Sequence, residues 1–333
     1  MRFRLTRHSD LATFRELLHP GLRLSDRTRA ALVDLLATLL PHRPATTTIE
    51  DPTRPYPASI EAIGLSVAVT DAFIDEALEH PRPYLAETFF ERMLDGRSPV
   101  LSPSEARAAN SSSGLNVLVV HFGRRDPDMT GERMRRVAQA GSAAFYFTHT
   151  GYRVKVLANE VFGHDEARYM EAGGFRLIDD FRNPSRLELA NVPADRWPYL
   201  FALRKEWIVP GAVNQLAFLF HPLPPELGLS ASEQGVLLRA LLNESDQQIA
   251  DESGITLDAV KKTWRRLYER MTLTAPHVLG TEAPGQVAPG RSTEKRRHLL
   301  EYIRMHPEEL RAFKTALSPA TSVAPRSRRT RSR

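Results

Sequence analysis

Apolar residues are spaced differently in the first two thirds of the chain and in the last third. Up to about residue 225, short apolar runs typical of strands alternate with amphipathic helical patterns. Residues 115–122 (LNVLVVHF) are the most strand-like run, because they are apolar without interruption, as in a strand covered on both faces. We predict strands at residues 1–6, 46–50, 62–69, 115–122, 152–157, 176–180 and 215–220, and helices at residues 10–18, 26–41, 70–95 (broken at Pro81 and Pro83), 132–149, 164–173 and 197–206.

This order predicts a fold of the α+β class. Residues 1–225 should form a mixed α/β domain with helices packed against a sheet, and an all-α region should follow.

Three short helical patterns occupy residues 229–271. Ser245 and Gln248 have the spacing of a capping box at the start of the second helix, and Gly254 follows its end, where glycine takes positive φ without strain. Thr256 is suited to cap the third helix. The third helix has an apolar face of Val260, Trp264, Leu267 and Met271 and a basic face of Lys261, Lys262, Arg265 and Arg266. Two short helices, a glycine turn and a basic second helix are typical of a helix-turn-helix.

The same stretch resembles the LuxR-type helix-turn-helix without a gap. The matching residues are Leu229-Ser230, Glu233, Val236, Leu237, Ser245, Ile249, Ala250, Ile255-Thr256, Val260-Lys261, Leu267 and Met271. The chain departs from the family at Asn243, where glycine is usual, at Ser253, where leucine is usual, at Thr263, where histidine is usual, and at Arg266, where asparagine is usual. We expect Ser253 to leave a hole in the core of this region.

The resemblance implies that the third helix, at about residues 257–271, reads the major groove of DNA. Lys261, Lys262 and Arg265 then face base edges, where lysine and arginine donate to guanine. Arg266, Arg270 and the capping Thr256 are expected to contact phosphates. Trp264 either completes the core or packs on the first domain. Specific binding by so small a region is expected to need a homodimer on paired half-sites.

The first domain resembles acyl-CoA N-acyltransferases of the GNAT type. The resemblance lies in the order of its elements, in the N-terminal sequence FRLTRHSDLATFRELL, and in Gly173-Gly174-Phe175 after a short helix. That family binds the pyrophosphate of CoA on a turn of the pattern Arg/Gln-x-x-Gly-x-Gly/Ala, whereas the loop here reads GRRDPDMTGERM and contains two aspartates. We therefore predict a degenerate, sensor-like domain and a protein that is not an enzyme. The alternative is an N-acyltransferase-like enzyme fused to a DNA-binding module.

Other candidate chemistry is scattered along the first domain. His121, His149 and His164 lack the spacing of metal ligands, and we interpret them, with Glu160 and Glu166, as surface or capping residues. No metal and no cofactor is predicted. Five aromatic residues could line a ligand pocket or simply fill the core: Tyr146, Phe147, Tyr152, Phe162 and Phe175.

Composition narrows the class of protein further. The chain of 333 residues contains no cysteine, which excludes disulfides and thiolate metal sites and is consistent with a reducing compartment. No apolar run approaches the roughly 20 residues that span a bilayer, and the N-terminus lacks the apolar region of a signal peptide. A cytoplasmic protein with no membrane contact is expected. The net charge of +5 favours polyanionic partners.

Taken in order, the chain is predicted to contain an α/β sensor-like domain at 1–225, a LuxR-type DNA-binding domain at 226–273, a linker at 274–291, a helical pair at 292–317 and a disordered basic tail at 318–333. Prolines at 222–225 should make a stiff hinge. The predicted function is transcription regulation by binding of double-stranded DNA. A small molecule or a protein is the expected effector of the first domain.

Overall fold

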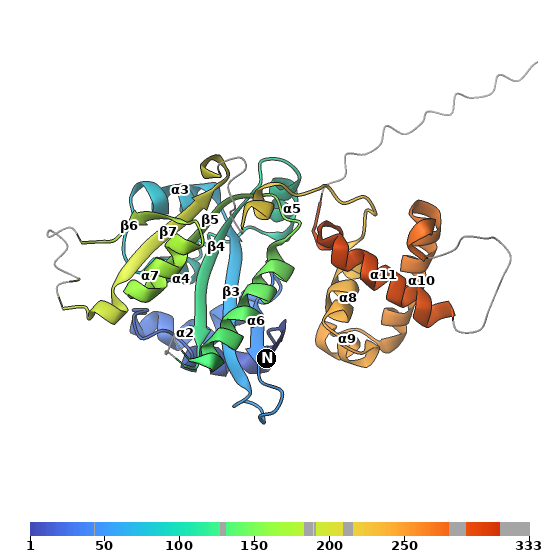
Figure 1. The fold of residues 1–333 in the computed structure, drawn as a ribbon, viewed down its shortest axis with the longest axis horizontal. Coiled ribbons are helices and arrows are strands. Elements are labelled where there is room, and N and C mark those ends of the chain that lie inside the picture. The colour runs from blue at the N-terminus through green and yellow to red at the C-terminus, as the bar shows by residue number, and fades with distance from the viewer. Residues whose placement is uncertain are drawn as a thin grey trace, which may run out of the picture.

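The computed structural model describes residues 1–42, 44–126, 131–182, 189, 191–208, 216–279 and 291–313. Figure 1 shows an α/β part that contains the N-terminus and a helical part beside it. Predicted features within 127–130, 183–188, 209–215, 280–290 and 314–333 lie outside the described residues, among them most of the predicted linker and the basic tail. Among the described residues, no helix has the length and apolar character that crossing a membrane requires.

A seven-stranded mixed sheet forms the centre of the α/β part. Its spatial order is β1-β2-β3-β4-β5-β7-β6, and among these strands the neighbours β4 and β5 are parallel, whereas the other pairs are antiparallel. The strands are β1 (Arg2–Leu5), β2 (Thr47–Glu50), β3 (Ile60–Val69), β4 (Leu115–Arg124), β5 (Val154–Phe162), β6 (Arg176–Asp179) and β7 (Pro198–Arg204). The prediction of a mixed α/β sheet carrying helices is confirmed.

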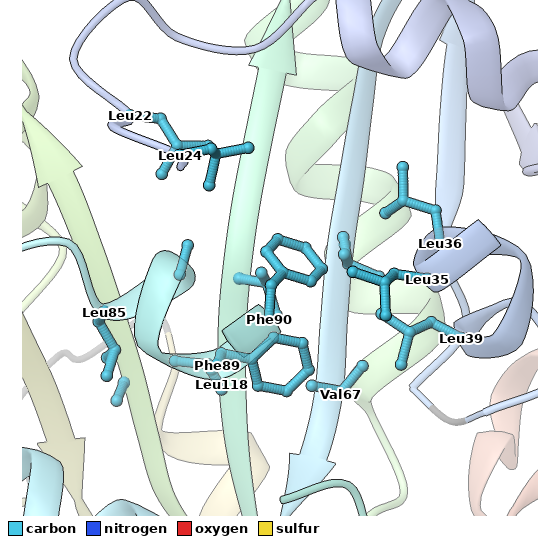
Figure 2. Packing of buried hydrophobic residues seen from close by; sticks show 14 of the residues in the cluster. Leu22, Leu24, Leu35, Leu36, Leu39, Val67, Leu85, Phe89, Phe90 and Leu118 are labelled. Atoms are coloured by element: carbon cyan, nitrogen blue, oxygen red, sulfur yellow. The ribbon is translucent and has the colours of Figure 1, made fainter. Parts of the chain in front are cut away.

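Helices cover both faces of this sheet because its central strands are apolar on both sides. On one face lie α1 (Leu11–Glu16), α2 (Asp26–Leu39), α3 (Asp71–Glu79) and α4 (Leu85–Leu94), which share a core with β3 and β4. The other face is covered by α6 (Glu132–His149) and α7 (His164–Ala172). Figure 2 shows Leu35, Leu36 and Leu39 of α2 and Phe89 and Phe90 of α4 around Val67 and Leu118.

Two predicted elements of this part are wrong. Residues 197–206, predicted as a helix, contain strand β7, which pairs with β5 and β6. Its residues Tyr199–Leu203 are all buried, so the helical spacing that the sequence suggested reflects an uninterrupted apolar run covered on both faces. Residues 215–220, predicted as a strand, are described from 216 and contain the 3-10 helix Ala217–Phe220, whose Leu219 and Phe220 fill the core instead of pairing.

One helix of the α/β part had not been predicted. Helix α5 (Pro103–Ser111) begins with Ser102 as its N-cap, Pro103 in its first turn and Glu105 closing a capping box. These three residues are a helix-start signal in the sequence. The helix was not predicted because its residues are mostly polar, and most helices are identified in a sequence by the spacing of apolar residues along one face.

The helical part contains α8 (Ala231–Leu241), α9 (Asp246–Ser253), α10 (Leu257–Thr274) and α11 (Arg291–Met305). Leu299 and Ile303 of α11 lie in the same apolar cluster as the residues of α8, α9 and α10. After α11, the predicted final helix is a 3-10 turn, Pro307–Leu310, and Arg311 is already extended. Pro307 starts this turn, but the described chain does not continue it as an α-helix.

The residues after α11 join the helical part to the α/β part. Arg311 is 2% exposed, and its guanidinium donates to the carbonyl oxygens of Thr150 (2.8 Å) and Phe147 (2.5 Å) at the end of α6. The Glu309 carboxylate accepts from the backbone N–H groups of Glu226 and Leu227. The start of the helical part is therefore held by hydrogen bonds, although prolines alone suggested a stiff hinge.

Candidate functional site

The turn between α9 and α10 has the local chemistry that the sequence predicted. Ser245 Oγ accepts from the Gln248 N–H and Gln248 Oε1 accepts from the Ser245 N–H, so a capping box starts α9. Gly254 ends α9 with φ 64°, a conformation that costs a glycine little. Thr256 Oγ1 then accepts from the Ala259 N–H at 3.1 Å and starts α10.

Helix α10 presents one buried and one cationic face. Val260, Trp264, Leu267 and Met271 are at most 5% exposed and belong to the apolar cluster of the helical part. Between these buried positions, four cationic residues lie exposed near the middle of the helix: Lys261, Lys262, Arg265 and Arg266. The helix therefore offers solvent a row of lysines and arginines on a rigid support.

The six predicted DNA-contacting residues differ in their present partners. Lys262 Nζ lies 2.9 Å from Asp258 one turn earlier, where both side chains are exposed, and this ion pair lowers the pKa of Asp258. Arg270 Nη2 lies 3.2 Å from Glu233 of α8. Burial opposes ionisation of Glu233, but hydrogen bonds from Ser230 and the charge of Arg270 lower its pKa overall. Arg270 therefore joins α10 to α8, and its role as a phosphate contact stays a prediction.

Trp264 completes the core, which confirms the first of the two roles predicted for it. Its indole Nε1 donates to Asp246 Oδ1 at 3.1 Å. Arg296 of α11 donates to the same oxygen at 2.8 Å and lies 4.3 Å from the centre of the indole ring. Helices α9, α10 and α11 thus meet at one buried ring, which fixes the direction in which α10 points.

Two departures from the LuxR-type pattern have structural explanations. Asn243, where glycine is usual, has φ 63°, and asparagine is one of the few residues that tolerate this region. Ser253, where leucine is usual, lies exposed at the end of α9. The expectation that Ser253 leaves a hole in the core is therefore wrong, because this position does not face the core.

A second candidate site lies where β4 and β5 separate. The two parallel strands pair from Leu115 with Val154 to Val119 with Asn159, although β4 continues to Arg124 and β5 to Phe162. Val120 is the extra residue of a bulge, because Leu65 of β3 pairs with His121 and Ser66 with Val119. Bulges are common beside active sites, and the carboxyl ends of parallel strands are where open α/β sheets bind ligands.

Buried titratable groups surround this separation. The Nε2 of His121 accepts from the His19 N–H at 3.1 Å, and burial lowers the pKa of His121 to about 3. Glu160 accepts from the N–H groups of Tyr84 (2.7 Å) and Leu85 (2.9 Å) at the start of α4, while burial raises its pKa to about 8. His121, His149 and Glu160 are at most 7% exposed, so none of them is a surface residue as predicted, although Glu160 does cap the start of α4.

Three arginines near the end of β4 and the start of α6 have partners among the described residues. Arg124 Nη2 lies 2.5 Å from Glu166 Oε1, so an ion pair joins the end of β4 to α7. Arg125 donates to the Ile60 carbonyl, and Arg133 pairs with Glu61. Arg125 and Arg133 are thus engaged, and Glu132 supplies a negative charge in the first turn of α6, where an anion would dock.

The other scattered candidates are not brought together. Among the described residues, no group of three histidine, cysteine, aspartate or glutamate side chains has a metal-binding arrangement. The five aromatic residues proposed for a pocket lie in different places. Phe162 lies in the core that α4 shares, Tyr152 and Phe175 lie in the core near Phe220, Phe147 of α6 packs against the apolar cluster of the helical part, and Tyr146 is 37% exposed at the surface.

Of the three comparisons with known proteins, the one with solved structures found matches. No protein-family model and no curated protein matches the chain. Solved structures similar to it include the C-terminal condensation domain of Ebony with beta-alanyl-dopamine (10% identity, TM-score 0.37), the GphF GNAT-like decarboxylase with isobutyryl-CoA (14%, 0.32) and a mosquito arylalkylamine N-acetyltransferase-like protein 5b (14%, 0.33). Each match covers 61% of this chain and 98–99% of the other.

These neighbours correct one prediction. They are named as a condensation domain, a GNAT-like decarboxylase and an N-acetyltransferase-like protein, and these names contradict the prediction that the protein is not an enzyme. That conclusion relied on the missing glycine spacing after Phe122, which concerns a single anion-binding turn and leaves the separation of β4 and β5 intact. At TM-scores below 0.5, the likeness carries no argument about the reaction, substrate or cofactor of this chain.

Proposed function

We propose that the protein binds double-stranded DNA through helix α10 and regulates transcription. The supporting observation is the row of four exposed cations on a helix whose opposite face is buried. A glycine turn of positive φ and a capping threonine set this helix across α9, as a recognition helix requires.

The proposed contacts follow from the positions on α10. Lys261, Lys262 and Arg265 donate to base edges in the major groove, where each good pair contributes about 1–3 kcal/mol of discrimination. Arg266 and the N-terminus of α10 at Thr256 contact phosphates. Arg270 reaches a phosphate while it keeps its ion pair with Glu233.

A homodimer is part of the proposal. One helix-turn-helix buries little surface, and specific operators are commonly read by two copies related by two-fold symmetry. The α/β part then serves as the region that receives an effector, as the sensor-like prediction requires.

The test begins with selection of DNA from a random library by the full-length protein at physiological salt. Binding to the selected sequence is then measured by fluorescence anisotropy for Lys261→Ala and Arg265→Ala. Both variants are expected to bind the selected sequence more weakly, at a cost of about 1–3 kcal/mol each. Arg168→Ala, an exposed arginine on α7, is the matched control and should bind as the wild type does. Unchanged binding by both α10 variants would refute the proposal.

A second candidate function is group transfer in the α/β part, specifically acyl transfer. The observation that favours it is the bulge at Val120 beside the separated ends of β4 and β5. Because the chain contains no cysteine, a thiol reagent detects only the CoA released from an acyl-CoA. Release that depends on protein and on an added amine would support this function, and its absence across a panel of acyl-CoA thioesters and amines would refute it.

A further inference from the structure

A cleft of about 780 Å³ separates the α/β part from the turn between α8 and α9. Arg2 and Arg4 of β1, Arg7, and Arg136 of α6 line one side, and the other side is formed by Leu241–Glu244 and Gln248. Its volume lies within the range of about 300–1,000 Å³ that small-molecule sites occupy. A molecule in this cleft would touch both parts of the protein at once.

The lining of the cleft carries an excess of positive charge. Four arginines line it against two glutamates, Glu50 and Glu244. Glu50 accepts from the Nε atoms of Arg2 (2.7 Å) and Arg4 (2.8 Å), and Glu244 accepts from Arg239, which lies outside the lining. The arginines have carboxylate partners as well, because Arg4 binds Asp10, Arg7 Nε lies 2.9 Å from Glu252 and Arg136 pairs with Glu132. The positive charge that a ligand can meet therefore comes from Arg2 and Arg136, whose side chains are exposed.

Arg4 is held in the wall of the cleft by its partners, whereas Arg2 and Arg136 can contact a ligand. Arg4 is 9% exposed and binds Asp10 through both terminal nitrogens (2.6 and 3.0 Å), so it is fixed. Arg2 and Arg136 have side chains 67% and 64% exposed. Arg136 pairs with exposed Glu132, an interaction worth little in water, so the guanidinium can turn to an anion.

The side of the cleft that belongs to the helical part is part of the DNA-reading unit. Gln248 closes the capping box of α9, and Asn243 holds the turn before α9 in its positive-φ conformation. Helix α9 in turn packs on α10, since Asp246 binds the indole of Trp264. A ligand that contacts Gln248 and Arg136 would therefore set the position of α10 relative to the α/β part.

We propose that this cleft binds a small polyanion, a molecule with two or more phosphate or carboxylate groups, and that its binding changes the affinity of the protein for DNA. The binding itself stands on the cleft alone, whereas the regulation rests on the proposed DNA-binding function. The two anionic groups would contact Arg2 and Arg136, and the amides of Asn243 and Gln248 would supply neutral hydrogen bonds from the helical part.

The experiment titrates the full-length protein, without DNA, with pyrophosphate and with citrate by isothermal calorimetry at constant ionic strength. Saturable binding is expected. Arg2→Gln and Arg136→Gln each remove one charge-assisted contact and should weaken it roughly tenfold or more. The matched control is Arg135→Gln, a neighbouring exposed arginine of α6 that does not line the cleft. Absence of saturable binding, or equal affinity in the Arg135 and Arg136 variants, would overturn the proposal.

Two further measurements determine whether the cleft binds a small anion or the DNA backbone, and whether binding there regulates the affinity for DNA. If Arg136→Gln weakens DNA binding while neither small anion binds, the cleft holds the DNA backbone, and the small-molecule site is refuted. If pyrophosphate changes the affinity for selected DNA in the wild type and not in Arg136→Gln, regulation is supported. Unchanged DNA affinity at saturating pyrophosphate overturns regulation. Lys261→Ala should still bind pyrophosphate, so failure of DNA binding leaves the cleft testable.

Discussion

Replacing Glu160 by glutamine should change how stability depends on pH. The Glu160 carboxyl is buried on β5 and accepts two backbone N–H groups at the start of α4. Burial raises its pKa from 4.5 to about 8 in the folded protein, whereas the unfolded chain keeps the ordinary value. Between pH 4.5 and 8 the folded state therefore holds a proton that the unfolded state has lost.

The sign and the size follow from this difference. The free energy of unfolding falls as pH rises through this window, because the folded state binds more protons than the unfolded state and is therefore favoured less at lower proton concentration. Over about 3.5 pH units, at 1.36 kcal/mol per unit, the loss reaches roughly 5 kcal/mol above pH 8. Glutamine has no such loss, but its amide NH2 cannot accept from the second backbone N–H, as both oxygens of the carboxyl group do, and this costs about 1–3 kcal/mol.

The two effects predict a crossover. Glu160→Gln should be less stable than the wild type at pH 5 and more stable at pH 9, as measured by urea unfolding at intervals between these values. Glu171→Gln on the exposed side of α7 should follow the wild type throughout. If the difference between Glu160→Gln and the wild type stays constant with pH, Glu160 is ionised at no cost, and the reasoning from burial is wrong.

Two further substitutions test the helical part and its attachment. Asn243→Ala should lower the free energy of unfolding by about 1 kcal/mol, because φ 63° is strained for alanine, whereas Asn243→Gly should be close to neutral. Urea unfolding in which the alanine variant is more stable than the glycine variant would contradict this. Arg311→Met removes the donors to Phe147 and Thr150 and should cost about 2–4 kcal/mol in the same assay, whereas Arg304→Met on the exposed side of α11 should have little effect.

The sequence predicted those parts of the fold whose signals are local. Strands β3 and β4 and helices α2 and α6 lie close to where periodicity predicted them, and Ser25, Ser245 and Thr256 cap helices as their residue types suggest. Strand β7 was missed because its identity depends on pairing with β5 and β6, which lie far from it in the chain. An apolar run of seven residues does not distinguish a covered strand from a buried helix.

The candidate sites also differ in how far local sequence signals predict them. The cations of α10 follow from helical spacing, since their exposure needs only the apolar face on the opposite side. In contrast, the burial of Glu160 and His121 could not be predicted, because isolated polar residues within strands carry no local sign of burial. Their burial depends on α4 and on the backbone of His19, which tertiary packing brings to β4 and β5. The cleft of Arg2 and Arg136 likewise joins residues more than 100 positions apart.

The contacts of residues 306–313 bear on how an effector could act. The apolar cluster of the helical part includes Leu5 and Ala45 of the α/β part, and Arg311 binds the end of α6. Because α10 packs into that same cluster, its orientation is coupled to the α/β part by packing and hydrogen bonds. A ligand in the cleft would therefore favour either the state in which α10 keeps its contacts with the α/β part or a state in which these contacts are broken together. Regulation of DNA binding requires that the ligand bind these two states with different affinities.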